Sequence, residues 1–213
     1  MPSDTGSGRP TSSPERSPRR ARAYGLGPFV LENYEDAERD ALLWLAANHA
    51  VDGVILTTPW NENEQLHREL AERGMPFVLL PRPEGLDSPG VRSRDDDGAA
   101  MLVRHLVEFG HRRFGLIGGQ PDIDLTRLKL KGYDRAMVDA GLDPHAAPRV
   151  LKDYTFQTGY DAARRMLEKP GRPTALVCLS DLLGAGALRA AHEMGLRIPD
   201  DLSVVGMGDL MAG

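Results

Sequence analysis

Residues 172–209 read RPTALVCLSDLLGAGALRAAHEMGLRIPDDLSVVGMGD and contain, in order, the patterns of a strand, a helix and a second strand. The run Leu176-Val177-Cys178-Leu179 is continuously apolar, which is typical of a strand that helices cover on both faces. The helical stretch after it ends at Gly195, because glycine readily adopts the left-handed conformation that closes a helix. The run SVVGMG at 203–208 predicts the next strand. The segment therefore predicts two parallel strands joined by a helix.

The same alternation extends upstream. We expect strands at 29–33, 53–58, 77–80, 113–119 and 149–153, and helices at 34–48, 62–73 and 96–109, one ending before Gly141, and one from about 158 that Pro170 ends. Repeated strand–helix units with right-handed crossovers predict an α/β fold with mostly parallel sheets. Ligands of such sheets bind at the carboxyl ends of the strands. Functional residues are therefore expected just after the strands, at 57–60, 82, 119–122, 154, 180–181 and 207–209.

Composition and charge restrict the class of protein. The 213 residues are 41% hydrophobic and 27% charged, with a formal net charge of -5, which is ordinary for a globular protein and does not indicate a nucleic-acid-binding surface. No apolar run approaches the roughly 20 residues of a membrane helix, and no secretory signal pattern is present. Cys178 is the only cysteine, so it predicts a buried side chain and no disulfide framework. We expect a cytoplasmic protein with no metal site and no cofactor.

Residues 1–22 differ from the rest of the chain. Ser, Pro, Gly and Arg dominate this segment, as in SGRPTSSPERSPRRAR. Such a composition buries too little apolar surface to offset the entropy of ordering, which predicts a disordered tail. Its arginines could contact phosphates, but a solvated tail is the simpler interpretation.

Several phrases, in their order along the chain, carry a resemblance to a known family. They are VDGVILTTP, RGMPFVLLPR, DDDGAAMLVRHLVEFGHRRFGLIGG, RLKLKGYDRAMVDAGL, TGYDAARRML and the segment 172–209. Together they resemble the effector-binding domain of LacI/GalR-type transcriptional regulators. The resemblance implies the periplasmic-binding-protein-like type I fold, in which two α/β lobes flank a cleft that binds a small effector. It also implies a homodimer and no catalytic residues.

The resemblance implies a division of the chain into lobes. The amino lobe is expected at 23–109 and the carboxyl lobe at 110–213, with the first crossing near 109–111. Complete members of the family begin with a helix-turn-helix head that reads DNA, and no such pattern is present in these residues. The sequence also ends soon after GMGD, before the positions of the family's final strands. We therefore expect a domain incomplete at both ends, with DNA binding confined to a head outside it.

Three residues match effector-binding positions of the family. Asp97 precedes a glycine at a helix start, where sugar-responsive relatives carry a ligand-binding carboxylate, although an acid there is also favourable for the helix itself. Lys129 stands three residues before Gly132, where relatives carry an arginine; lysine keeps the charge but not the bidentate geometry. Tyr154 corresponds to an aromatic that stacks on the effector, although partial burial in the core is an equal alternative.

Three further residues complete the predicted site. Ser180-Asp181 matches the family's Asn-Asp, and the serine loses the two-sided donor and acceptor pattern of the amide. Asp181 could bind ligand, but a role as helix N-cap is slightly favoured. Trp60, after a predicted strand, would line the cleft or pack against the lobe edge. Gly208 departs from the family, whose members carry a ligand-binding aspartate there, so a typical monosaccharide is not expected. The resemblance implies a carbohydrate or related metabolite as effector.

The sequence has three other interpretations. An enzyme is disfavoured because the chain contains no dinucleotide-binding glycine pattern, nucleophile elbow, P-loop or HExxH sequence. A secreted solute-binding protein of the same fold is an alternative, since fold alone does not fix function. Against it, GHRRFGLIGG and RIPDDLSVVG are closer to the regulators. A gene fragment without function of its own is the third.

Overall fold

The computed structural model of the chain describes residues 36–209 together with Gly25 and Gly27. The predicted tail at 1–22 and the predicted strand at 29–33 lie outside the described residues. Within them, strands and helices alternate along the chain as the apolar runs predicted. None of the described helices combines the length and apolar character that crossing a bilayer requires.

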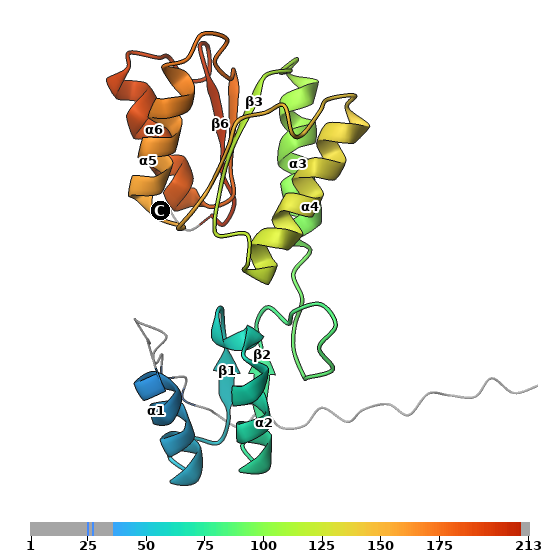
Figure 1. Cartoon of the computed structure of the whole chain (residues 1–213), viewed down its shortest axis with the longest axis vertical. Coiled ribbons are helices and arrows are strands. Elements are labelled where there is room, and N and C mark those ends of the chain that lie inside the picture. Colours follow the sequence, from blue (N-terminus) through green and yellow to red (C-terminus); the bar gives the residue numbers. More distant parts are fainter. Residues whose placement is uncertain (1–24, 26, 28–35, 210–213) are drawn as a thin grey trace, which may run out of the picture. The chain divides into compact units, whose positions relative to one another are not determined.

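The first part of the described chain forms a two-stranded parallel sheet (Figure 1). Its elements are α1 (Asp36–Ala47), β1 (Val54–Leu56), the short 3-10 helix η1 (Trp60–Glu62), α2 (Glu64–Glu72) and β2 (Phe77–Leu79). Val54 lies opposite Phe77 in the register. Helix α2 begins where the side chain of Asn63 accepts a hydrogen bond from the Leu66 backbone, and Leu66 and Leu70 are fully buried. Its apolar side therefore packs into the core of this part.

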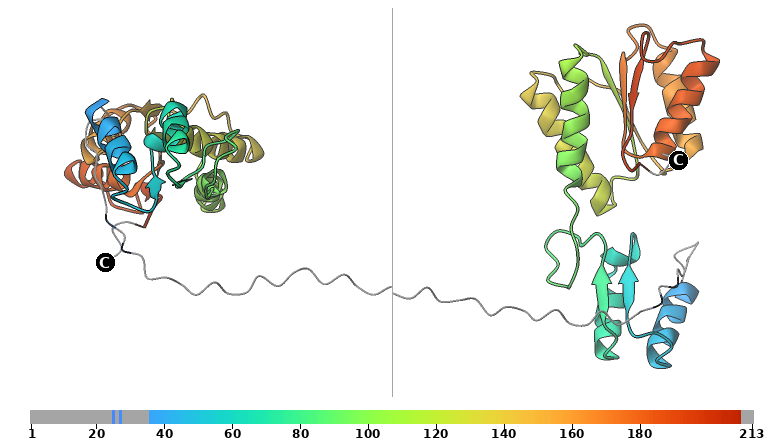
Figure 2. Two further views of the ribbon diagram at one scale, coloured as in Figure 1. Left: turned by 90° about the horizontal axis from the view of Figure 1, so that it is seen from below. Right: turned by 180° about the vertical axis from the view of Figure 1, so that it is seen from behind.

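The second part is a four-stranded, fully parallel sheet in the order β4-β3-β5-β6. Helices α3 and α4 cover one face and helices α5 and α6 the other (Figure 2). The elements are α3 (Asp95–Glu108), β3 (Phe114–Gly118), α4 (Asp124–Asp139), β4 (Arg149–Leu151), α5 (Phe156–Leu167), β5 (Ala175–Cys178), α6 (Asp181–Glu193) and β6 (Ser203–Val205). The predicted α/β class with parallel sheets is confirmed.

The central strand β5 supplies both halves of the hydrophobic core. Ala175, Val177 and Leu179 pack with residues of α3 and α4, whereas Leu176 and Cys178 pack with α5 and α6. Successive side chains of a strand point to opposite faces, so a continuously apolar run is what a sheet covered on both faces requires. The Cys178 thiol is fully buried, and burial raises its pKa to about 12. The prediction of a buried cysteine is confirmed.

Helix α3 packs with the second sheet. Its buried residues Ala99, Ala100, Val103 and Leu106 belong to the same core as strand β3. A boundary at 109/110 would separate this helix from the strands that it covers. We therefore propose that the lobe boundary lies before Asp95, in the segment that follows β2.

Helices α5 and α6 approach each other closely enough to require glycine. A Cβ at Gly186 would lie 2.1 Å from the Phe156 carbonyl oxygen, and one at Gly159 would lie 2.2 Å from the Leu183 carbonyl oxygen. Gly184, on the same helix as Gly186, has room, since its nearest neighbour would be the Cys178 Cβ at 3.8 Å. The three glycines therefore differ in what they contribute.

We expect Gly186→Ala to destabilise the fold by about 1–3 kcal/mol, because the backbone of α5 would have to move. Gly184→Ala is the matched control on the same helix. It should be neutral or stabilising by up to about 1 kcal/mol, because alanine is the better helix former. Urea unfolding of both variants measures the difference. Equal free energies of unfolding would show that the two helices are not in such close contact.

His111 joins the starts of two strands in the second sheet. Its Nδ1 lies 2.9 Å from the Thr174 hydroxyl and its Nε2 lies 2.9 Å from the Ser203 hydroxyl. Both hydroxyls flank strands that pair with each other, β5 and β6. Burial lowers the pKa of His111 below its ordinary value of 6.5. The folded chain therefore favours the neutral imidazole.

A depressed histidine pKa predicts how stability depends on pH. The unfolded chain binds a proton more readily than the folded one, so the contribution of His111 is present above the unfolded pKa and is lost as the pH falls through the folded pKa. Urea unfolding between about pH 7.5 and about pH 5 should show this loss, and His111→Gln should reduce it. His145→Gln, at an exposed position, is the control. A parallel pH dependence for wild type and His111→Gln would contradict the assignment.

Candidate functional site

A buried lysine lies at the centre of the polar residues at the carboxyl ends of the second sheet. Helix α4 holds Lys129 at 8% exposure. Its Nζ donates to the carbonyl oxygen of Leu179 at 3.0 Å, at the end of β5, and lies 4.0 Å from Asp95 Oδ1. The same Nζ is 5.4 Å from the centre of the Tyr154 ring. Burial lowers the pKa of Lys129, while the charges of Asp95 and Asp181 oppose that change.

Tyr154 follows strand β4 and lies against the end of β3. Its hydroxyl is 3.0 Å from the Thr126 hydroxyl. A Cβ at Gly119 would lie 2.0 Å from the Tyr154 Cε2, so glycine is needed for the ring to reach this place. Burial raises the pKa of Tyr154, and hydrogen bonds with Thr126 and the Gly119 backbone oppose the rise. The ring is partly buried and packs against both halves of the core.

Ser180 and Asp181 open helix α6. The Ser180 hydroxyl accepts a hydrogen bond from the Leu183 backbone at 3.3 Å, so Ser180 is the N-cap and Asp181 lies in the first turn. The interpretation that favoured Asp181 as N-cap is therefore wrong by one residue. Asp181 still contributes its charge to the environment of Lys129.

The three consecutive aspartates at the start of α3 have different partners. Asp95 lies beside Lys129 and accepts a hydrogen bond from the Ser93 hydroxyl. Asp97 instead pairs with Arg135, with 3.0 Å between Oδ1 and the guanidinium. The sequence analysis selected Asp97 as the ligand-binding candidate, whereas the aspartate that lies beside Lys129 is Asp95. The side chains of Asp95, Asp96 and Asp97 are 17%, 24% and 47% exposed, so Asp95 is the most buried of the three.

Trp60 belongs to the first sheet. It begins η1 after strand β1, and its carbonyl oxygen lies 3.0 Å from His67 Nε2. The fold therefore brings together Lys129, Tyr154 and the start of α6, whereas Trp60 lies next to the first sheet.

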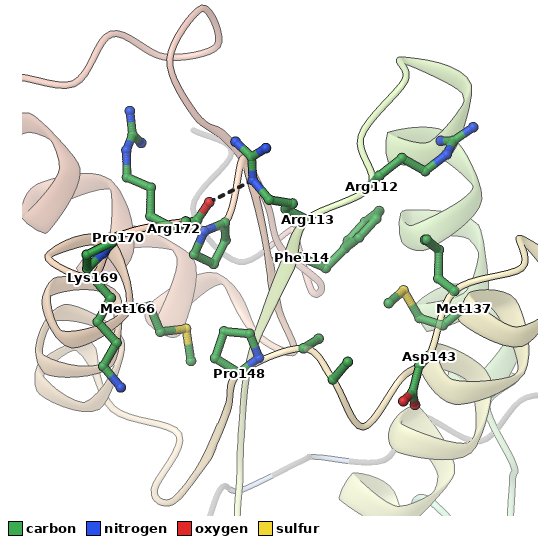
Figure 3. Close-up of a pocket in the computed structure, with 15 residues that line it drawn as sticks. Arg112, Arg113, Phe114, Met137, Asp143, Pro148, Met166, Lys169, Pro170 and Arg172 are labelled. Atoms are coloured by element: carbon green, nitrogen blue, oxygen red, sulfur yellow. Dashed lines mark hydrogen bonds between the residues drawn. The ribbon is translucent and has the colours of Figure 1, made fainter.

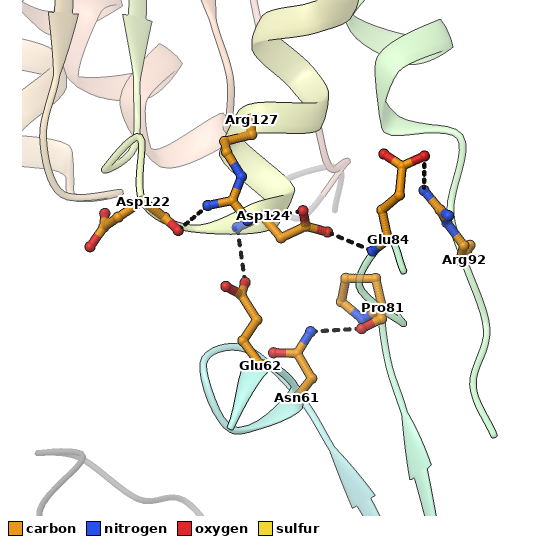
Figure 4. A network of polar contacts seen from close by, with 8 residues as sticks. All are labelled: Asn61, Glu62, Pro81, Glu84, Arg92, Asp122, Asp124 and Arg127. Atoms are coloured by element: carbon orange, nitrogen blue, oxygen red, sulfur yellow. Dashed lines mark hydrogen bonds and ion pairs between the residues drawn. The ribbon is translucent and has the colours of Figure 1, made fainter. Parts of the chain in front are cut away.

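The two sheets are connected at the start of α4 (Figure 4). The Asp124 backbone N–H donates to Glu62 Oε1 at 2.9 Å, and the Glu84 backbone N–H lies 3.4 Å from Asp124 Oδ2. Arg127 pairs with Asp124 at 3.1 Å. Burial raises the pKa of Glu62, and the hydrogen bond from Asp124 opposes the rise. A carboxylate from the first sheet thus accepts from the amino-terminal end of a helix of the second, where a negative charge is favourable.

The residues after β6 include a glycine where the resemblance implies a ligand-binding aspartate. Gly208 has φ of +133°, a conformation that residues with a Cβ rarely adopt. Beside it, Met207 contacts helix α3: a Cβ at Gly98 would lie 2.9 Å from the Met207 methyl carbon. The position where an aspartate was expected therefore has neither the side chain nor an ordinary backbone. Among the described residues, no group of three or more His, Cys, Asp or Glu could hold a metal ion.

Comparison with known proteins decides the family. The sequence profile of the periplasmic binding protein-like domain matches residues 103–212. The chain belongs to this family, as a LacI-type effector-binding domain. The resemblance to this family stated from the sequence is confirmed.

Relatives with curated descriptions are transcriptional regulators. The regulator CelR of Thermobifida fusca is 34% identical over 169 residues, which cover 78% of this chain and 49% of that protein. The repressor PurR of Haemophilus influenzae (strain PittEE) is 27% identical over 189 residues, covering 88% of this chain and 56% of the repressor. The LacI-type chain thus spans about half the length of the curated relatives it matches. The prediction that it is not an enzyme agrees with these relatives and is confirmed.

Solved structures support the same assignment. A regulatory protein of the LacI family from Chloroflexus aggregans superposes with a TM-score of 0.73 at 29% identity, covering 81% of this chain and 63% of that one. A complex of CelR with cellobiose gives a TM-score of 0.71 at 32% identity, covering 81% of this chain and 53% of the other.

We expect Lys129→Met to destabilise this LacI-type domain by about 1–3 kcal/mol, because the Leu179 carbonyl loses its donor and Asp95 loses its cation. Lys131→Met, at an exposed position on the same helix, should change stability by less than about 0.5 kcal/mol. Urea unfolding gives both values. A double-mutant cycle with Asp95→Asn isolates the pair, and strict additivity would show that Asp95 and Lys129 do not interact.

Proposed function

We propose that this chain is the effector-sensing part of a LacI-type transcriptional regulator and that it binds a small molecule, a carbohydrate or related metabolite. The observation that carries the proposal is the convergence of Lys129, Asp95, Tyr154 and the start of α6 at the carboxyl ends of the second sheet. That edge is where open parallel sheets bind ligands. The cellobiose complex of CelR supports a carbohydrate for this chain as well.

Each predicted residue has a role in this proposal. The Tyr154 ring would stack on the apolar face of a sugar ring, while Ser180 and Asp181 would bind hydroxyl groups. Asp97 would contact ligand from the outer side of α3, and Trp60 would approach from the first sheet. Lys129 contributes charge, but its ammonium group already has Leu179 and Asp95 as partners.

The same residues favour a neutral effector. The ammonium of Lys129 is balanced by the nearby carboxylates of Asp95 and Asp181, so little uncompensated positive charge is left to attract an anion at this edge. Lysine also lacks the bidentate geometry by which arginine binds a carboxylate or a phosphate. A neutral sugar that hydrogen-bonds with hydroxyl and carboxylate groups fits the site better than a sugar phosphate does.

A regulator of this kind would transmit effector binding through its lobes. In the proposed mechanism the protein is a cytoplasmic homodimer whose DNA contacts belong to a helix-turn-helix head outside these residues. The contact between Glu62 and the start of α4 links the two sheets and would respond to lobe movement. An effector shifts such an equilibrium only by its difference in affinity for the two states. Exposed apolar side chains on α5 and α6, among them Phe156, Leu182 and Leu188, support a partner surface there.

A ligand screen by thermal unfolding tests the proposal. The screen contains cellobiose, monosaccharides, sugar phosphates and purine bases. A specific ligand at about one hundred times its Kd should raise the midpoint by roughly 5–10 °C. We expect a neutral sugar to give the rise and Tyr154→Ala to abolish it, measured against that variant's own midpoint without ligand.

Matched variants identify which residues bind. Tyr160→Ala removes a partly buried tyrosine of α5 whose hydroxyl donates to Glu193, and it should leave the rise intact. Asp97→Ala and Asp95→Ala, compared in the same screen, distinguish a ligand contact at the outer aspartate from one at the inner aspartate. A flat response from folded wild-type protein across the panel would refute the proposed site.

A further inference from the structure

A second site lies at the opposite ends of the strands in the second sheet. There the loops before β3, β4 and β5 surround a cavity of about 500 Å³ (Figure 3). Its volume is in the range of small-molecule sites. None of its lining residues belongs to the predicted effector site, because Phe114 begins β3 whereas Lys129 and Tyr154 meet the carboxyl ends.

The floor of the cavity is apolar. Phe114, Met137 and Met166 line it and are 2%, 2% and 4% exposed. Pro148 lies between the two methionines in the view of Figure 3. Thioether side chains adapt their shape and contact aromatic rings favourably. The floor therefore suits a flat or branched apolar body.

The rim of the cavity is cationic. Arg112, Arg113, Lys169 and Arg172 line it, against the single acid Asp143. The concentration of positive charge is notable in a chain whose formal net charge is -5.

The guanidinium groups of this rim bind only backbone oxygens. Arg113 donates to the Arg172 carbonyl oxygen at 3.1 Å, Arg172 donates to that of Asp201 at 3.3 Å, and Arg112 donates to that of His111 at 2.8 Å. Elsewhere arginines such as Arg135 and Arg197 pair with carboxylates. Across residues 36–209, no carboxylate lies within ion-pairing distance of the four rim cations; the Asp201 carboxylate interacts with Arg172 from further away and is itself paired with Arg197. Their charge therefore remains available to an anion.

We propose that this cavity binds a small organic anion, with its carboxylate or phosphate group against the arginine and lysine rim and its apolar body on the Phe114, Met137 and Met166 floor. Guanidinium groups bind both kinds of oxyanion through paired N–H donors. The chain then carries two ligand sites of opposite preference, one for a neutral effector at the carboxyl ends of the strands and one for an anion at the amino ends.

Methyl NMR of methionine-labelled full chain tests the proposal, because methionines report on both sites. Met137 and Met166 line the cavity, whereas Met207 lies at the other ends of the strands, beside Gly98. Benzoate and phenyl phosphate are the anionic probes and benzamide is the neutral isostere. We expect saturable shifts of the Met137 and Met166 methyl signals, with benzamide at least about tenfold weaker. The relative affinities of benzoate and phenyl phosphate identify the preferred oxyanion.

Two kinds of variant separate the rim from the floor. The double variant Arg113→Gln/Lys169→Gln should weaken anion binding by about tenfold or more, while Arg104→Gln, an exposed arginine of α3 outside the cavity, should not change it. Ala146→Trp places a large side chain at an exposed lining position and should block binding without altering the core. The proposal is overturned by equal affinity for benzamide, by wild-type affinity in the double variant, or by shifts confined to Met207. None of these results depends on whether the neutral effector of the other site has been found.

Discussion

The second sheet and its predicted site both depend on the contacts of the buried Lys129 ammonium group with the Leu179 carbonyl and the Asp95 carboxylate. Removing an ammonium group from water is unfavourable unless hydrogen bonds and opposite charge compensate it. Here the Leu179 carbonyl, the Asp95 carboxylate and the Tyr154 ring provide that compensation from three separate elements. One side chain of α4 thus fixes the end of β5, the start of α3 and the loop after β4 relative to one another. Any ligand at this edge meets groups whose positions are already set by the core.

The close approach of α3 and α4 follows from the same arrangement. Gly132 lies one turn beyond Lys129, and a Cβ there would lie 1.9 Å from the Asp96 carbonyl oxygen. One further turn along, Arg135 pairs with Asp96 and Asp97. Three successive turns of α4 therefore contact the first turn of α3 in different ways: through the Lys129 ammonium, the Gly132 backbone and the Arg135 guanidinium. Acidic residues in the first turn of a helix are favourable in themselves. The three aspartates therefore stabilise the start of α3 and also hold it against α4.

Sequence alone was enough for much of this fold and for only part of the site. A continuous apolar run located β5, and Gly110 and Gly195 marked helix ends that do adopt positive φ. These signals are local. What sequence did not reveal depends on tertiary placement: a helix pattern at 96–109 does not say which sheet the helix covers, and α3 covers the second. Sequence also does not show which of three consecutive aspartates lies beside Lys129. The N-cap at Ser180 differs from the predicted Asp181 by one position that only backbone geometry decides.

The two ends of the second sheet differ in how their cations are satisfied, and this difference separates structural charge from charge available to a ligand. At the carboxyl ends, Lys129 is buried and has a carbonyl oxygen and a carboxylate for partners. Its field is therefore largely cancelled, and in the proposed function recognition there would rest on hydroxyls, an aromatic ring and helix-start acids. At the amino ends, Arg113 and Arg172 donate only to carbonyl oxygens, which orient a guanidinium without neutralising it. A backbone oxygen carries a partial charge and a carboxylate a full one, so only the second arrangement leaves a field that an anion would sense. Lys129, which is buried and paired with a carboxylate, therefore stabilises the fold. Arg113 and Arg172, which donate only to backbone oxygens, keep the charge that the proposed anion site requires.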